Sequence, residues 1–262
     1  MRIITLTTDL GLKDHYLALV KAEIYKQLEE INIVDISHKI SKFDIQEAAY
    51  IFKNCYKNFP DGTIHILGIN EEITNEHQHI AIKINNQYVI GPDNGIFSLI
   101  FNEMKPDNIV RLNISQDSND FTFAIKDVFV KAACHIARDG TLEMIGSHLA
   151  DIQVNRSSIK AVIDKNSIRG IITYIDSYGN ATTNIDRSIF NKIGLNRDFQ
   201  ILYGRENERL TRISQKYKDV PEGERLAIFS SNDLLEISIN QGKANELLGL
   251  NQFDIIRIEF KT

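Results

Sequence analysis

The feature that most constrains the fold is a regular alternation of short β-rich runs with segments of helical periodicity. The β-rich runs are residues 2–8, 31–37 and 62–69. The helical segments are residues 14–28 and 44–55, and Asp14 and Asp44 are residues of the type that caps a helix start. A strand–helix–strand–helix–strand order predicts right-handed crossovers and a mainly parallel sheet covered by helices.

The following segments extend this α/β pattern to about residue 160. Runs at 79–84 and 87–91 predict a hairpin, because Asn85 and Asn86 tolerate the positive φ angles of a tight turn. A helix opened by residues 92–95, a strand over 108–114 and a helix over 126–140 complete the predicted domain, residues 1–160.

The C-terminal part has a different pattern. From Ser167 onward, β-rich runs alternate with turn residues, and only residues 240–250 favour a short helix. This pattern predicts a smaller all-β, barrel-like domain over residues 161–262.

Composition narrows the classes of function. The 262 residues include 30 Lys and Arg and 35 Asp and Glu, scattered along the chain with a net charge of −5, so no basic stripe for nucleic acid is present. No apolar run approaches the ~18–20 residues of a membrane span, and the N-terminal run does not resemble a secretory signal. Cys55 and Cys134 lie in apolar helical patterns, which is typical of reduced, buried thiols. We therefore expect a cytoplasmic protein without nucleic-acid or membrane partners.

The carboxyl ends of the predicted strands are the first place to look for a site, because open α/β sheets bind ligands there. Asp9 follows the first strand and could accept hydrogen bonds from a ribose diol, or it could cap a turn. No dinucleotide, P-loop or nucleophile-elbow motif occurs. His77 and His79 have the HxH spacing of metal ligands, but no third ligand accompanies them, so we expect no metal site.

A second candidate cluster follows a predicted strand of the C-terminal domain. Asp176, Tyr178 and Asn180 place a carboxylate, an aromatic ring and an amide within five positions. An aromatic ring can stack on a base while an amide reads its edge, as adenine sites often require. The same residues also favour a polar β-turn, and both interpretations stay open.

The chain resembles, over almost its whole length, the S-adenosylmethionine hydroxide adenosyltransferases, which are related to the S-adenosylmethionine-dependent chlorinase and fluorinase. The matching segments are TTDLGLKDHY (7–16), VDISHKISKFDIQEAAY (34–50), FPDGTIHI (59–66), GPDNGIFSLI (91–100), KDVFVKAACHIARDG (126–140), YIDSYGNATTNI (174–185) and LEISINQGKANELLGL (235–250).

The resemblance implies a homotrimer whose sites lie between the N-domain of one subunit and the C-domain of the next. It also implies a small adenosyl ligand and no metal or other cofactor, with S-adenosylmethionine as substrate or ligand. The implied contacts are Asp9 with the ribose diol, Asp14 and Asp176 with the methionine amine, Phe43 over the sugar, Tyr178 and Asn180 with adenine, and Ser231 with the methionine carboxylate.

The positions that handle water in the family differ here. In place of a VDPGVGxxRR-like segment, Asn70 takes the Asp position and His77 the Arg position, and Ala124 takes the His position of a TFHGRD-like segment. An Asn side chain binds water but does not accept its proton at neutral pH, and Ala does neither. His77 or a neighbouring carboxylate is then the candidate base, and the ionisable residues near in sequence are Glu71, Glu72, Lys126 and Asp127.

Three hypotheses follow from the resemblance. The first is an S-adenosylmethionine hydrolase that forms adenosine and methionine by attack of water or hydroxide at the ribose C5′. The second is a non-catalytic protein of the same fold that binds S-adenosylmethionine or adenosine. The third is a different reaction on an adenosyl compound.

Overall fold

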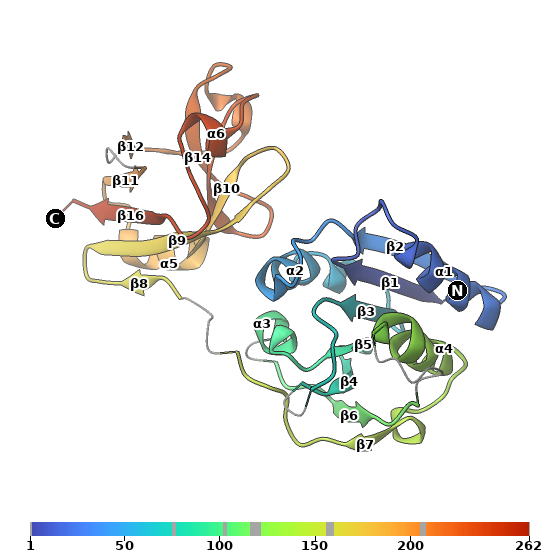
Figure 1. Ribbon diagram of the computed structural model, residues 1–262. Coiled ribbons are helices and arrows are strands. Elements are labelled where there is room, and N and C mark those ends of the chain that lie inside the picture. The colour runs from blue at the N-terminus through green and yellow to red at the C-terminus, as the bar shows by residue number, and fades with distance from the viewer. Residues whose placement is uncertain are drawn as a thin grey trace. The chain divides into compact units, whose positions relative to one another are not determined.

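The chain forms two compact units, Met1–Ser157 and Ser158–Thr262 (Figure 1). The structure, a computed structural model, describes residues 2–74, 77–101, 104–115, 122–155, 160–204 and 208–261. Each unit has its own sheet and its own hydrophobic core.

The described part of the N-terminal unit contains a seven-stranded sheet between two layers of helices (Figure 1). Across the sheet the strands are β2 (Asn32–Ser37), β1 (Ile3–Thr8), β3 (Ile64–Gly68), β5 (Gln87–Pro92), β4 (His79–Ile84), β6 (Asn108–Leu112) and β7 (Gly146–His148). Side chains of α1 (Tyr16–Gln27) and α4 (Val130–Ala137) join the core on one face, and those of α2 (Ile45–Lys53) and α3 (Ile96–Phe101) join the core on the other. Short helical turns are η1 (Tyr56–Asn58) and η3 (Leu142–Met144).

The sheet is mixed, so the prediction of a mainly parallel sheet is wrong. β1 pairs in parallel with β2 and β3, and β3 with β5, whereas β4 pairs antiparallel with β5 and β6, and β6 with β7. The hairpin at Asn85 and Asn86, whose φ angles are 50° and 57°, reverses the chain as predicted. The later strands β6 and β7 then extend the sheet beyond β4, each antiparallel to its neighbour.

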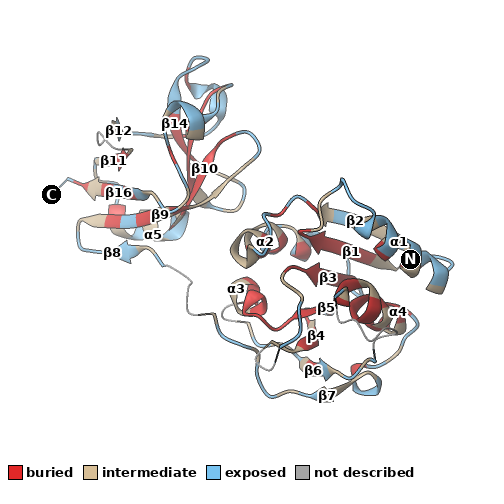
Figure 2. Cartoon of the chain, in the orientation of Figure 1, coloured by how far each residue is buried: buried red, intermediate tan, exposed pale blue. Residues whose placement is uncertain are grey.

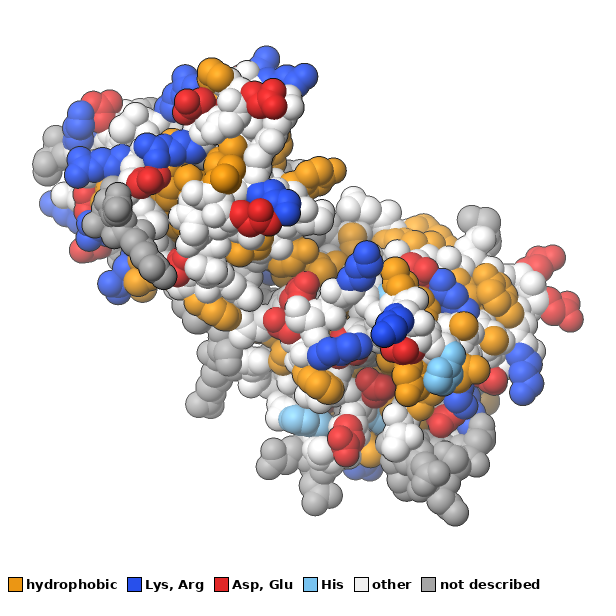
Figure 3. Space-filling view, turned by 45° about the horizontal axis from the view of Figure 1, so that its top comes forward, with side chains coloured by type: hydrophobic (Ala, Val, Ile, Leu, Met, Phe, Trp, Pro, Cys, Tyr) orange, Lys and Arg blue, Asp and Glu red, His pale blue; other side chains and the backbone are white. Residues whose placement is uncertain are grey.

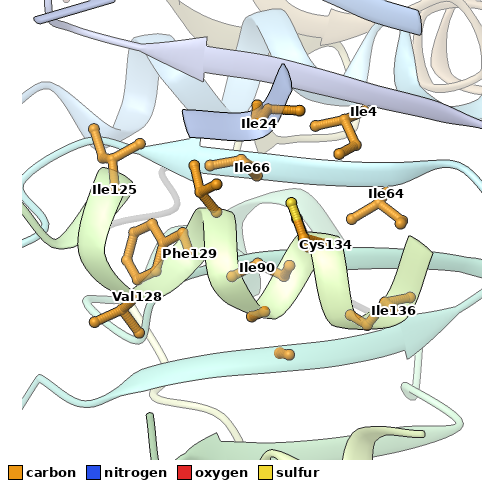
Figure 4. Packing of buried hydrophobic residues seen from close by; sticks show 14 of the residues in the cluster. Ile4, Ile24, Ile64, Ile66, Ile90, Ile125, Val128, Phe129, Cys134 and Ile136 are labelled. Carbon is orange, nitrogen blue, oxygen red and sulfur yellow. The ribbon is translucent and has the colours of Figure 1, made fainter. Parts of the chain in front are cut away.

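The central strands are buried on both faces, as Figure 2 shows for β1, β3 and β5. On one face, Ile4, Ile24 and Ile66 pack with Phe129 and Cys134 of the helical segment that covers this face (Figure 4). Burial raises the pKa of Cys134 to about 11, so this thiol stays protonated and acts as a small apolar group.

Two predicted helix starts have different outcomes. Asp44 caps α2 as predicted, because its Oδ1 accepts hydrogen bonds from the backbone N–H groups of Gln46 and Glu47 at 2.9 and 3.0 Å. Asp14 does not cap α1. The residue at the N-cap is His15, which makes no side-chain capping bond.

The Asp44 cap carries a stability prediction. We expect Asp44→Ala to lower the free energy of unfolding by about 1 kcal/mol, because two N–H groups of the first helical turn lose their acceptor. Asp44→Asn keeps an acceptor oxygen at the same place and should cost a few tenths of a kcal/mol. Urea unfolding of the three proteins measures both differences. Equal losses in the two variants would contradict the capping role.

The C-terminal unit contains a sheet that curls around a shared strand. Its described strands are β8 (Val162–Ile163), β9 (Ser167–Ile175), β10 (Ala181–Asp186), β11 (Phe199–Tyr203), β12 (Glu208–Leu210), β13 (Ile213–Ser214), β14 (Arg225–Phe229), β15 (Leu234–Ile239) and β16 (Ile255–Phe260). β9 pairs with β16 through residues 167–171 and with β10 through residues 172–175, so it belongs to both halves of the curled sheet.

The unit is not all β, which corrects the prediction for this domain. Besides α6 (Ala244–Leu247), which lies within the predicted segment 240–250, it contains α5 (Arg187–Gly194) and the turn η4 (Tyr217–Asp219). Asp186 caps α5 by accepting a hydrogen bond from the N–H of Ile189 at 2.9 Å. α5 is only two turns long, so its apolar spacing is too short to separate it from the surrounding β pattern.

Candidate functional site

A cavity of about 280 Å³ lies beyond the carboxyl ends of β1 and β3. Asp9 follows β1, and Asn70 to Glu72 follow β3, so parallel pairing of these two strands brings both segments to one edge of the sheet. The lining residues are Asp9, Phe43, Asn70, Glu71, Glu72 and Thr122.

Asp9 joins this cavity to the loop between β2 and α2. Its side chain is buried, and its Oδ2 accepts a hydrogen bond from the backbone N–H of Phe43 at 2.9 Å. Lys42 donates from Nζ to the Asp9 main-chain carbonyl. Asp9 therefore contacts a loop that is remote in sequence, whereas the sequence also allowed it to cap a turn of its own segment. A carboxylate has about four acceptor sites, so this contact leaves capacity for a diol.

Phe43 adopts a backbone conformation that is unusual for an aromatic residue. Its φ is 65°, in the left-handed region, and its side chain is 69% exposed at the cavity rim. Such a conformation costs on the order of 1 kcal/mol or more and persists where surrounding contacts impose it. The Asp9 hydrogen bond is one such contact. The exposed ring is in a position to cover a ligand in the cavity.

The segment after β3 is fixed by hydrogen bonds to three successive carbonyl groups. Nδ2 of Asn94 donates to the carbonyls of Ile69 and Asn70 at 3.1 and 3.2 Å. Nε2 of His79 lies 2.7 Å from the carbonyl of Glu71 and donates to it. Asn70 has a φ of 50°, which Asn tolerates better than most residues.

Glu71 has the most perturbed carboxyl group of this cavity. Burial raises its pKa to about 7, the negative charge of Asp9 acts in the same direction, and Lys42 acts in the opposite direction. The group therefore exchanges protons near neutral pH. Sequence reasoning identified Glu71 only as a neighbouring carboxylate, because a burial-driven pKa has no signal in the residue pattern.

Three predicted site residues of the N-terminal unit do not line this cavity. Asp14 is exposed in the turn before α1, and Ala124 is buried in the core at the start of the helical segment. The backbone N–H of His77 bonds to Thr74 Oγ1 at 2.9 Å, and its side chain is close enough to Asp93 to lower the pKa of that carboxyl group, which burial otherwise raises. Among the described residues, the cavity thus gathers Asp9, Phe43 and Asn70 and leaves out the predicted base His77.

The helical segment after Thr122 begins with a π-helical turn, η2 (Ile125–Phe129), which continues into α4. Ile125 is fully buried, and a Cβ added to Gly68 would lie 2.4 Å from its Cδ1. Ile125 therefore fills the space above Gly68 at the end of β3. Lys126 and Asp127 form an ion pair next to it.

Three C-terminal candidates, Asp176, Tyr178 and Asn180, line a separate cavity of about 700 Å³. Asp176 Oδ1 accepts hydrogen bonds from the N–H groups of Tyr178 and Asn180, both at 2.9 Å, and Oδ2 accepts from Asn180 Nδ2 at 3.0 Å. With Gly179 at a φ of 85°, these bonds make the polar turn that sequence allowed. The Tyr178 ring is 77% exposed and stands free to stack on a planar ligand.

Ser231 lies away from this cluster. It is exposed in the turn between β14 and β15, next to the end of β15 that pairs with Asp186. The Asp176–Asn180 loop meets the opposite end of β15, because Ala181 pairs with Ile237.

Sequence reasoning missed a buried acid behind the C-terminal cavity. Tyr217, which lines the cavity, donates from its hydroxyl to Glu236 Oε1 at 2.8 Å, and Ser238 donates to the same oxygen at 2.6 Å. Burial raises the pKa of Glu236. Glu236 occupies a strand position between apolar residues, so nothing in the local pattern distinguishes it.

Other site classes have little support. Within the described ranges, no group of three His, Cys, Asp or Glu side chains could hold a metal ion, and His79 is bound to Glu71 and packed edge-on against Phe129. None of the described helices is long and apolar enough to span a membrane. On the face shown in Figure 3, basic and acidic side chains are interspersed.

Comparisons with known proteins agree with the two-unit organisation. The model of the SAM hydroxide adenosyltransferase N-terminal domain matches residues 4–146, and that of the C-terminal domain matches residues 170–257. An (R)-S-adenosyl-L-methionine hydrolase of Thermus thermophilus is 27% identical over 98% of this chain and 100% of its own length. A fluorinase of Nocardia brasiliensis is 23% identical over 74% of each chain.

A solved structure extends the likeness to three dimensions. An uncharacterized conserved protein from Thermotoga maritima superposes with a TM-score of 0.88 at 28% identity, over 98% of this chain and 99% of that one. One family model matches each unit, and so the chain belongs to the SAM hydroxide adenosyltransferase family.

Proposed function

We propose that this protein is an S-adenosylmethionine hydrolase. Water or hydroxide attacks the ribose C5′, a C5′–O bond forms as the C5′–S bond breaks, and the bonding pair leaves with the methionine sulfur. The products are adenosine, methionine and one proton. The observation that carries the proposal is the cavity in which the Asp9 carboxylate, the Phe43 ring and the Glu71 carboxyl group lie together, in a chain of this family.

The cavity supports a division of roles between its residues. Asp9 accepts hydrogen bonds from the ribose diol, Phe43 covers the sugar, and Asn70 hydrogen-bonds the attacking water. Desolvation and alignment of the water with the C5′–S bond supply much of the rate, since the sulfonium is already a good leaving group. For this reason we propose that no metal or other cofactor takes part.

The remaining assignments rest on the family resemblance. Tyr178 and Asn180 would bind adenine, and Asp14, Asp176 and Ser231 would bind the methionine part. We also propose a homotrimer with sites formed between subunits, which light scattering at several protein concentrations tests. The free thiols of Cys55 and Cys134 support a cytoplasmic location.

The test is incubation of the purified protein with S-adenosylmethionine in ¹⁸O-labelled water. We expect adenosine and methionine in equal amounts, with one ¹⁸O atom in the 5′-hydroxyl of adenosine, because water attacks carbon. Chromatography with mass spectrometry measures both. Asp9→Ala purified in the same way controls for contaminating enzymes.

The other outcomes separate the remaining hypotheses. Saturable binding of S-adenosylmethionine without any product would replace the hydrolase by a binding protein. Adenosine without the isotope would show that the oxygen comes from elsewhere, which would require a different reaction.

A further inference from the structure

Hydrolysis at C5′ releases a proton from the attacking water. At the positions where the family has an Asp and a His to handle this water, this chain has Asn70 and Ala124. Asn70 lines the cavity but its amide does not accept a proton, and Ala124 has no functional group. His77 does not line the cavity. If the proposed function holds, another group must take the proton.

Glu71 lines the cavity on a backbone segment that the fold holds in place. The hydrogen bonds from Asn94 and His79 to the carbonyls of residues 69–71 fix its backbone, and these donors come from the segment after β5 and from the start of β4. A positioned base needs such a rigid support, because proton transfer depends on hydrogen-bond geometry.

The charged groups around Glu71 act in opposite directions on its ionisation, so the side chain can both accept and release a proton. Asp9 disfavours the ionised form and Lys42 favours it. His79 faces the Glu71 carbonyl, and burial lowers its pKa, so it stays neutral and serves as a donor. Glu72, the remaining acid of the cavity, is exposed to solvent.

We propose that Glu71 is the general base of this protein and accepts the proton of the attacking water. This inference rests on the proposed hydrolase function. In the step, the Glu71 carboxylate takes the proton as the water oxygen bonds to C5′ and the C5′–S pair passes to sulfur. The protonated carboxyl group then returns the proton to solvent.

The test compares Glu71→Gln with the wild type and with Glu30→Gln, the same change at an exposed position before β2. We expect kcat of Glu71→Gln to fall about 100- to 1,000-fold with KM changed less than about threefold. The wild-type kcat should rise with pH through an apparent pKa of about 7, and this rise should be lost in the variant. Glu71→Asp, which keeps a carboxylate, should recover part of the rate.

The outcomes distinguish this role from the function on which it rests. An active wild type together with a Glu71→Gln variant within about threefold of its kcat and with the same pH profile would overturn the role of Glu71 alone. Loss of the pH dependence in His77→Gln in place of Glu71→Gln would assign the proton to His77. A wild type without turnover would overturn the hydrolase itself. Retained saturable binding of S-adenosylmethionine by Glu71→Gln confirms that the variant is folded.

Discussion

Replacing Asp9 by alanine is expected to weaken binding of S-adenosylmethionine and of adenosine by roughly 100-fold, about 3 kcal/mol. The change removes a buried carboxylate that, in the proposed site, accepts charge-assisted hydrogen bonds from both ribose hydroxyls, each worth about 1.5–3 kcal/mol. Isothermal titration calorimetry with both ligands measures the loss. Unchanged affinity in a folded variant would remove Asp9 from the site.

The same side chain also holds Phe43, so a control must separate the two roles. Asp9→Asn keeps an oxygen that can accept the Phe43 N–H but loses the charge. If Asp9 binds the diol, Asp9→Asn weakens adenosine binding about tenfold or more, and it has a much smaller effect on 2′-deoxyadenosine, which lacks one hydroxyl. Equal effects on both ligands would show that Asp9 acts only by holding the loop.

Sequence patterns correctly predicted the features whose conformation depends only on residues close by in the chain. The hairpin at Asn85 and Asn86 and the Asp44 cap follow from turn and cap chemistry that a few residues determine. The antiparallel edge formed by β6 and β7 was not predicted, because pairing of remote strands depends on the whole sheet.

The candidate site also contains residues that the sequence could place and residues that it could not. Asp9 and Asn70 could be brought together from sequence because both follow strand ends, and parallel pairing puts those ends at one edge. Phe43 was placed with them only by the family resemblance. His77 was placed by counting seven residues along a loop, and a loop does not keep such a spacing in space. The protonation behaviour of Glu71 depends on burial and on Asp9, which only the folded chain brings close.

His65 should make the protein lose stability in acid. It is fully buried in β3, with Nδ1 2.7 Å from Thr5 Oγ1, Nε2 3.4 Å from Gln87 Oε1, and its ring edge-on to Phe52. Burial lowers its pKa from 6.5 to about 4. The unfolded chain therefore binds the proton first, so the stability from neutral His65 is complete above about pH 6.5 and is lost as pH falls toward 4. The loss should reach about 2 kcal/mol at about pH 5.

The matched control is His65→Gln, which keeps polar atoms but does not titrate. Carboxyl groups whose pKa values burial raises, such as those of Asp93 and Glu236, stabilise the fold as pH falls, so the wild-type pH dependence alone mixes opposite contributions. Urea unfolding of both proteins at about pH 7.5 and pH 5 isolates the His65 contribution as the difference between their two pH effects.

The variant starts less stable at neutral pH, because a buried packing and hydrogen-bonding site is disturbed, but it should lose about 2 kcal/mol less on acidification. Parallel losses in the two proteins would mean that protonated His65 is accommodated in the fold, which its aromatic surroundings and its two neutral partners argue against.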